Sequence, residues 1–168
     1  IENNLRSLWL VASMLIIFGI ILGVADRFGK SERVLEQLTT RDGVLYGAAQ
    51  ALALMPGVSR SGATIAMGRF LGYKREAALR YSFLLALPAV FGSGFYQLQG
   101  ALTSTDSSNV FSLTEIAVAT AIAFVVGYLV ISWLLKFVST KSFMPFIVYR
   151  IALGTLILIL LGTGVITA

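Results

Sequence analysis

Four long runs without a charged side chain dominate the sequence. They cover residues 7–25, 81–105, 116–135 and 151–168, with lengths of 19, 25, 20 and 18 residues. Each is close to the roughly 20 residues that an α-helix needs to cross the hydrocarbon core of a bilayer. Membrane-crossing β-strands are about half as long and alternate in polarity, and these runs show no such alternation. The sequence therefore predicts an all-α integral membrane protein with four spans.

The composition agrees with this class. Charged residues make up 12% of the chain, against roughly 25% in soluble domains. The net charge of +5 comes from basic residues between the apolar runs, where cytoplasmic loops concentrate Lys and Arg. We therefore expect anionic lipid headgroups as partners and no nucleic acid. The absence of His and Cys excludes imidazole bases and thiolate nucleophiles, so any catalysis must use hydroxyls, carboxylates, Arg, Lys or Tyr.

A fifth apolar segment is interrupted. The uncharged stretch 43–59 contains Pro56 and Gly57 near its end, which predicts that one helix stops near Met55 and another begins near Ser59. Two helices of about 10–13 residues rise only ~15–20 Å each, too little to cross a bilayer. We therefore expect a re-entrant hairpin at about 43–68. Re-entry places the three basic loops on the cytoplasmic side and both chain ends outside, within a single transmembrane domain, 1–168.

Polar groups gather at the expected hairpin tip. This stretch contains Ser59, Arg60, Ser61, Gly62 and Thr64. An Arg within the membrane costs from ~2.5 to more than 10 kcal/mol, so a functional reason for it is expected. Ser59 is a suitable N-cap, and the positive end of the following helix beside a guanidinium suits an anion such as phosphate. The alternative is a structural kink in which Arg60 pairs with a carboxylate from elsewhere in the bundle.

Other polar residues are weaker candidates. Gln50, on the first arm of the hairpin, could contact a ligand or join helices, since amides often connect membrane helices. Arg150 lies near the start of the last span, which we expect to begin near Phe143, so its guanidinium is expected to reach the headgroups beside Tyr149. The carboxylates fall at expected loops or helix ends, and no metal ligands are predicted in this chain.

Three segments carry a resemblance to a known family. They are Gln50-Ala-Leu-Ala-Leu-Met-Pro-Gly-Val-Ser-Arg-Ser-Gly-Ala-Thr-Ile65, Ser82-Phe-Leu-Leu-Ala-Leu-Pro88 and Phe143-Met-Pro-Phe-Ile-Val-Tyr-Arg150. In them the chain resembles the undecaprenyl-diphosphate phosphatases, or bacitracin-resistance proteins, of bacterial inner membranes. Family members contain two inverted repeats, each with a re-entrant hairpin. The resemblance covers this whole chain but only the second half of the family, so the N-terminal half, with its Glu and His motifs, is missing.

The resemblance implies hydrolysis of undecaprenyl diphosphate to undecaprenyl phosphate, which recycles a lipid carrier for peptidoglycan synthesis and confers bacitracin resistance, at a site facing the outer side. It implies catalytic roles for Arg60 and Ser59 and substrate contacts from Thr64, Ser61, Gly62 and Gln50. It also implies a divalent cation, Mg²⁺ or Ca²⁺, held by the missing half. This chain alone is then expected to bind substrate without turnover, with the N-terminal half and a second copy as candidate partners. The alternative is a transporter or flippase that binds the headgroup without hydrolysis, because broken helices are also a transporter feature.

Overall fold

The computed structural model describes residues 7–103 and 112–166, whose regular elements are helices. Four of these helices are long and apolar enough to cross a membrane. They are α2 (Leu8–Phe28), α5 (Arg75–Thr103), α6 (Leu113–Thr140) and α7 (Met144–Gly162). The prediction of an all-α membrane protein with four spans is confirmed, and so is the start of the last span next to Phe143, which caps α7.

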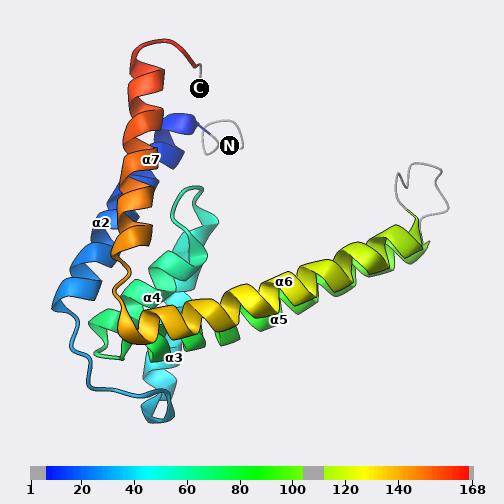
Figure 1. Cartoon of the computed structure of the whole chain (residues 1–168), viewed down its shortest axis with the longest axis horizontal. Helices are drawn as coiled ribbons and strands as arrows, with labels where there is room; N and C mark the ends of the chain where they lie inside the picture. Colours follow the sequence, from blue (N-terminus) through cyan, green and yellow to red (C-terminus); the bar gives the residue numbers. More distant parts are fainter. Residues whose placement is uncertain (1–6, 104–111, 167–168) are drawn as a thin grey trace.

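Helices α2 and α7 lie side by side (Figure 1), and glycines allow their close approach. A Cβ atom at Gly154 would lie 2.7 Å from the Ile16 side chain and 2.8 Å from the Ala12 carbonyl oxygen. Small residues let membrane helices come into backbone contact, which favours association where lipid removes the hydrophobic drive between helices. Together α2 and α7 form one wall of the central bundle.

Two short helices form a hairpin against this wall. Helix α3 (Thr40–Ala51) continues into the short 3-10 turn η2 (Leu52–Leu54), and α4 (Arg60–Phe70) begins directly after Ser59. The interruption predicted at Pro56 and Gly57 is confirmed. Figure 1 shows α4 returning alongside α3, so the hairpin starts and ends at the same end of the bundle. Helix α4 also packs on α2 and α5, which makes it the central element of the fold.

Two buried carboxylates, Asp26 and Asp42, connect the elements around the open end of this hairpin, where α3 begins and α4 ends. Asp26, at the end of α2, accepts hydrogen bonds from Arg75 Nε at 2.6 Å and from the Phe143 backbone N–H at 3.2 Å. It thereby joins α2, α5 and α7. Asp42 accepts from Arg33 Nη2 at 2.6 Å and from the Tyr73 hydroxyl at 2.7 Å.

The contacts of Asp42 shift the pKa values of this carboxylate and of Tyr73. The Arg33 guanidinium holds the pKa of the Asp42 carboxyl well below its usual range. Burial, followed by the hydrogen bond to Asp42, raises the pKa of Tyr73 to about 12. Asp42 also caps the first turn of α3 together with Thr39. This ionised network therefore ties the start of the hairpin to the turn that follows it.

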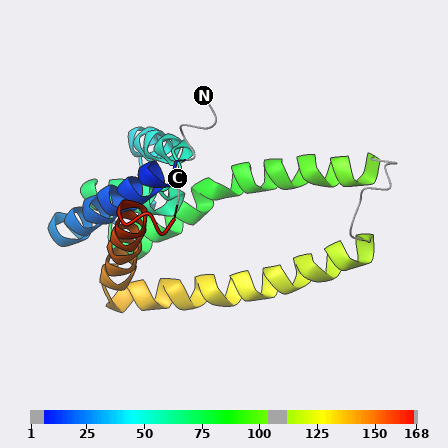
Figure 2. The same cartoon turned by 90° about the horizontal axis from the view of Figure 1, so that it is seen from above.

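Helices α5 and α6 extend well beyond the bundle. Figure 1 shows them leaving it as a long pair, and Figure 2 shows α5 (green) and α6 (yellow) separated along much of their length. Within the described part of α6, burial is confined to its C-terminal end, at Val138. A cavity of about 1060 Å³ lies between the outer parts of the two helices, next to Gly94 and Phe124. Their exposed apolar faces are those expected of helices that meet lipid.

Candidate functional site

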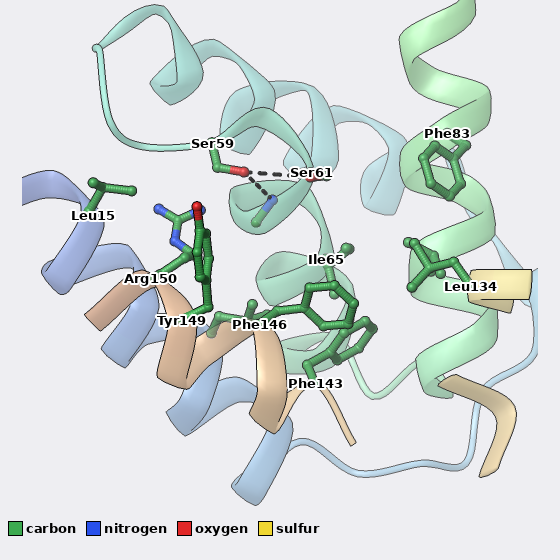
Figure 3. A pocket seen from close by; sticks show the side chains of 13 residues that line it. Leu15, Ser59, Ser61, Ile65, Phe83, Leu134, Phe143, Phe146, Tyr149 and Arg150 are labelled. Atoms are coloured by element: carbon green, nitrogen blue, oxygen red, sulfur yellow. Dashed lines mark hydrogen bonds between the residues drawn. The ribbon is translucent and has the colours of Figure 1, made fainter. Parts of the chain in front are cut away.

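A cavity of about 410 Å³ lies beneath the hairpin tip, between α4 and the surrounding helices α2, α5, α6 and α7 (Figure 3). Its polar lining consists of Ser59, Ser61, Gly62, Tyr149 and Arg150, and the rest is apolar. The volume falls in the range of about 300–1,000 Å³ that is usual for small-molecule sites. Three of the predicted site residues, Ser59, Ser61 and Gly62, therefore meet at one cavity.

Ser59 has an unusual backbone conformation. Its φ is 66°, and it is the only non-glycine residue with positive φ in the described chain. Such a conformation is strained for a residue with a Cβ, and strain of this kind often marks functional turns. The Ser59 hydroxyl accepts a hydrogen bond from the Gly62 N–H at 3.2 Å and lies 3.5 Å from the Ser61 hydroxyl. The predicted N-cap is confirmed, and it brings two hydroxyls to the positive end of α4.

Glycines lie at both ends of this turn, and the backbone conformation requires one at Gly57. Gly57 has a φ of +90°, and a Cβ atom there would lie 2.5 Å from the Val11 carbonyl oxygen of α2. At Gly62 a Cβ atom would lie 3.0 Å from Arg150 Nη1. The two glycines thus allow the turn to press against α2 and allow the Arg150 guanidinium to approach the first turn of α4.

Arg150 differs from its expected placement. Instead of reaching the headgroups it is buried, with 8% of its surface exposed. Its Nη2 donates to the carbonyl oxygens of Gly57 at 2.9 Å and Val58 at 3.0 Å. The expectation failed because these carbonyls, freed by the break in the helix, offer partners that sequence spacing does not reveal. The sequence did contain one indication that Arg150 is buried: it is the seventh residue of a span with no other charged side chain.

The charge of Arg150 has no counterion in the described structure. None of its contacts there is a carboxylate, and its Nε is buried without a hydrogen-bond partner. A buried guanidinium beside two hydroxyls and a helix N-terminus is a favourable environment for an anion. The cavity therefore has a cationic end.

Other predicted site residues lie apart from the cavity lining. Arg60 is half-buried at the first position of α4, and its guanidinium forms no hydrogen bond or ion pair with the described residues. Thr64 is fully buried, and its hydroxyl lies 2.6 Å from that of Ser82 on α5. The side-chain oxygen of Gln50 is buried without a partner among the described residues.

The cavity does not suit a divalent cation. Among the described residues no carboxylate lines it, and no group of three or more acidic, His or Cys side chains exists that could hold a metal. Mg²⁺ and Ca²⁺ take oxygen ligands that are mostly carboxylates, and Arg150 would repel them. The described residues around this cavity therefore do not form a site for a divalent cation.

The four candidate spans and the cationic cavity define a multi-pass helical membrane protein with a pocket suited to an anionic group. Comparison with known proteins identifies the family. The family described as "Bacitracin resistance protein BacA" matches residues 1–156, and the chain belongs to this family.

Curated relatives match along the whole chain. An undecaprenyl-diphosphatase of Pseudarthrobacter chlorophenolicus is 61% identical over 168 residues, all of this chain and 61% of the relative. The undecaprenyl-diphosphatase of Micrococcus luteus is 58% identical over the same length, covering 61% of that protein. Undecaprenyl-diphosphatase 2 of Agrobacterium fabrum is 60% identical, with 59% of its length covered. The chain thus spans about 60% of the length of these relatives.

Proposed function

We propose that this chain forms part of an enzyme that hydrolyses undecaprenyl diphosphate to undecaprenyl phosphate and inorganic phosphate. The observation that carries the proposal is its identity of 58–61% along the whole chain with proteins named undecaprenyl-diphosphatase. The cationic end of the cavity supports it, because a diphosphate requires positive charge and hydrogen-bond donors.

In the proposed reaction, water attacks the terminal phosphorus and the bond from that phosphorus to the bridging oxygen breaks. The bridging oxygen leaves on undecaprenyl phosphate, and the attacking oxygen becomes part of inorganic phosphate. The residues of this chain bind and stabilise negative charge. Arg150, Ser59 and the first turn of α4 would hold phosphoryl oxygens within the cavity, where water-poor surroundings strengthen each contact.

Arg60 would act from the first position of α4, next to the cavity lining residues Ser59 and Ser61. Since its guanidinium has no partner among the described residues, it is available to clamp the diphosphate in bidentate fashion. Thr64 lies one turn deeper and would act by fixing α4 to α5 through Ser82. Gln50, with its unpartnered buried oxygen, would complete the polar surroundings from α3.

For the membrane we propose that the hairpin is re-entrant from the cytoplasmic side of the bacterial inner membrane and that its site opens outward. The basic loops and the open end of the hairpin share one end of the bundle (Figure 1), as the excess of Lys and Arg in cytoplasmic loops requires. The remaining length of the protein would supply an inverted repeat, the attacking base and any divalent cation with its ligands.

The test is phosphate release from undecaprenyl diphosphate in proteoliposomes, using this chain joined to the remaining segment of the Pseudarthrobacter relative. Phosphate should appear in a stoichiometry of one per lipid consumed. Movement of a labelled lipid diphosphate across the bilayer, measured in the same vesicles, checks the transporter alternative. Lipid movement without phosphate release would overturn the phosphatase assignment.

A further inference from the structure

The polar lining of the cavity beneath the hairpin tip reaches the surface at one residue, Tyr149 of α7, which is 65% exposed in the described chain. The other polar lining residues are buried or half-buried, namely Ser59, Ser61, Gly62 and Arg150. Consecutive residues of an α-helix point about 100° apart, so Arg150 faces the turn while Tyr149 lies toward the outer edge of the cavity. Tyr149 therefore marks the exposed edge of its polar end.

The Tyr149 hydroxyl forms no hydrogen bond with the described residues, and Figure 3 shows its ring extending toward the turn that carries Ser59. Tyr149 is the sixth residue of α7, which begins at Met144, so roughly 8 Å of helix separates it from that end. It thus lies deeper than the first turn, where interfacial tyrosines contact headgroups. A hydroxyl without a partner at this depth is costly, and a ligand that accepts a hydrogen bond would remove that cost.

A lipid diphosphate has two different phosphoryl groups. The terminal group ends the molecule, whereas the inner group carries the lipid through an ester oxygen. The terminal group has more negative charge, so it suits the buried guanidinium of Arg150 and the hydroxyls beside it. With the terminal group there, the inner group lies toward the exposed edge of the cavity. The inner phosphoryl group is therefore the one nearest Tyr149.

We propose that the Tyr149 hydroxyl donates a hydrogen bond to the inner phosphoryl group, which stays on the lipid after hydrolysis. This inference rests on the function proposed above and adds a residue that recognises the leaving group. As the bond from the terminal phosphorus to the bridging oxygen breaks, negative charge grows on the inner phosphoryl group. A phenol donor at that group stabilises the charge and keeps its own proton. Tyr149 thus contacts the lipid product and not inorganic phosphate.

The first test uses the two products of the reaction as inhibitors of the reconstituted joined protein. Undecaprenyl phosphate retains the inner phosphoryl group, whereas inorganic phosphate retains only the terminal one. Tyr149→Phe should raise the inhibition constant for undecaprenyl phosphate about tenfold, because one hydrogen bond to a charged group is lost. The inhibition constant for inorganic phosphate should stay within about twofold of its original value.

The matched control is Tyr128→Phe, since Tyr128 is 66% exposed on α6 and does not line the cavity. It should leave both inhibition constants unchanged. Equal changes of the two constants in Tyr149→Phe, or an unchanged constant for undecaprenyl phosphate, would overturn the contact between Tyr149 and the inner phosphoryl group. A rise confined to inorganic phosphate would assign Tyr149 to the terminal group and would overturn the proposal as well.

A second measurement does not depend on turnover and separates this inference from the phosphatase assignment. Fluorotyrosine incorporated in place of Tyr149 gives a fluorine NMR signal that reports hydrogen bonding of the phenol. Undecaprenyl phosphate should shift this signal, and inorganic phosphate should not. A shift with undecaprenyl phosphate but no phosphate release from undecaprenyl diphosphate would refute the phosphatase and retain the Tyr149 contact. Phosphate release without such a shift would refute the contact alone.

Discussion

At the scale of the residue, two arginines near the hairpin tip have different surroundings and therefore different expected roles. Arg150 is buried and donates to the turn itself, at Gly57 and Val58. Arg60 is half-buried and has no hydrogen bond or ion pair with the described residues. Arg150 therefore holds the shape of the turn and also gives the cavity its positive charge, whereas Arg60 is free to engage a ligand.

Arg60→Ala should lower the rate of phosphate release by about 10²–10³-fold, because it removes a donor that stabilises charge on the transferred group. Arg60→Lys should recover only a small part of this, since an ammonium cannot form the bidentate fork. The measurement is phosphate release per mole of protein in proteoliposomes. Arg80→Ala, which removes an exposed arginine of α5, serves as the control. Undiminished release by the Arg60 variants would exclude this residue from the site.

Arg150→Met should destabilise the turn at the hairpin tip by about 1–3 kcal/mol, because it leaves two carbonyl oxygens without their donor. Amide hydrogen exchange within residues 56–62 should accelerate, and phosphate release should fall with it. Arg27→Met, at an exposed arginine of α2, should leave both unchanged. Unaltered exchange at the tip in Arg150→Met would show that this guanidinium does not hold the turn.

At the scale of the element, α4 is held from several sides, so its position depends on contacts that involve no substrate. The hydroxyls of Thr64 and Ser82 meet 2.6 Å apart in the α4–α5 contact. The Thr64 hydroxyl also lies 2.9 Å from the Arg60 carbonyl oxygen of its own helix. The location of Thr64 thus favours a positioning role.

Thr64→Val should reduce stability by about 1–3 kcal/mol, because the buried Ser82 hydroxyl loses its partner. Thr64→Ser retains the hydroxyl and should restore both stability and activity. If Thr64 acts by positioning α4, kcat should fall in the Val variant while the KM for undecaprenyl diphosphate changes little. A pure rise in KM with unaltered thermal stability would instead indicate direct substrate contact.

The start of the hairpin depends on pH through Asp42. Because Arg33 lowers the pKa of Asp42 in the folded chain, the unfolded state binds a proton at a higher pH than the folded state does. The stabilisation from this group is therefore complete above the ordinary carboxyl pKa of about 4 and decreases as pH falls through the lowered folded-state pKa. Asp42→Asn should destabilise the protein at pH 7 and make its thermal unfolding midpoint less dependent on pH below about 4. Glu36→Gln, at an exposed carboxylate, should reproduce neither change.

At the scale of the whole molecule, the described chain offers a cationic cavity but no described carboxylate or histidine beside it. Under the proposed function it would bind and orient a diphosphate, yet none of the described residues that line the cavity is a carboxylate base able to activate water. We expect this chain alone in proteoliposomes to bind undecaprenyl diphosphate without releasing phosphate, and the joined protein to release it. Thermal stabilisation by the lipid measures binding, and phosphate detection measures turnover. Turnover by the isolated chain would place the base within these residues.

The four spans and the break between α3 and α4 could be predicted from the residues alone. A bilayer requires long uncharged helices because no water is available to satisfy backbone groups. Pro56 removes a backbone donor, and Gly57 allows the φ of 90° that turns the chain, so the helix ends there. The N-cap at Ser59 could also be predicted, because its hydroxyl accepts from the N–H of Gly62, only three residues along the chain.

The surroundings of Arg150 and Thr64 could not be predicted in this way, because they depend on how the helices pack. Arg150 donates to backbone carbonyls more than ninety residues away in sequence, and Thr64 meets a hydroxyl of the following span. The sequence indicates what each side chain can bind, but it does not indicate which residues the side chain contacts. Their partners are set by how α4 packs against α5 and α7, because hydrogen bonds across helices depend on crossing geometry and not on spacing along one helix.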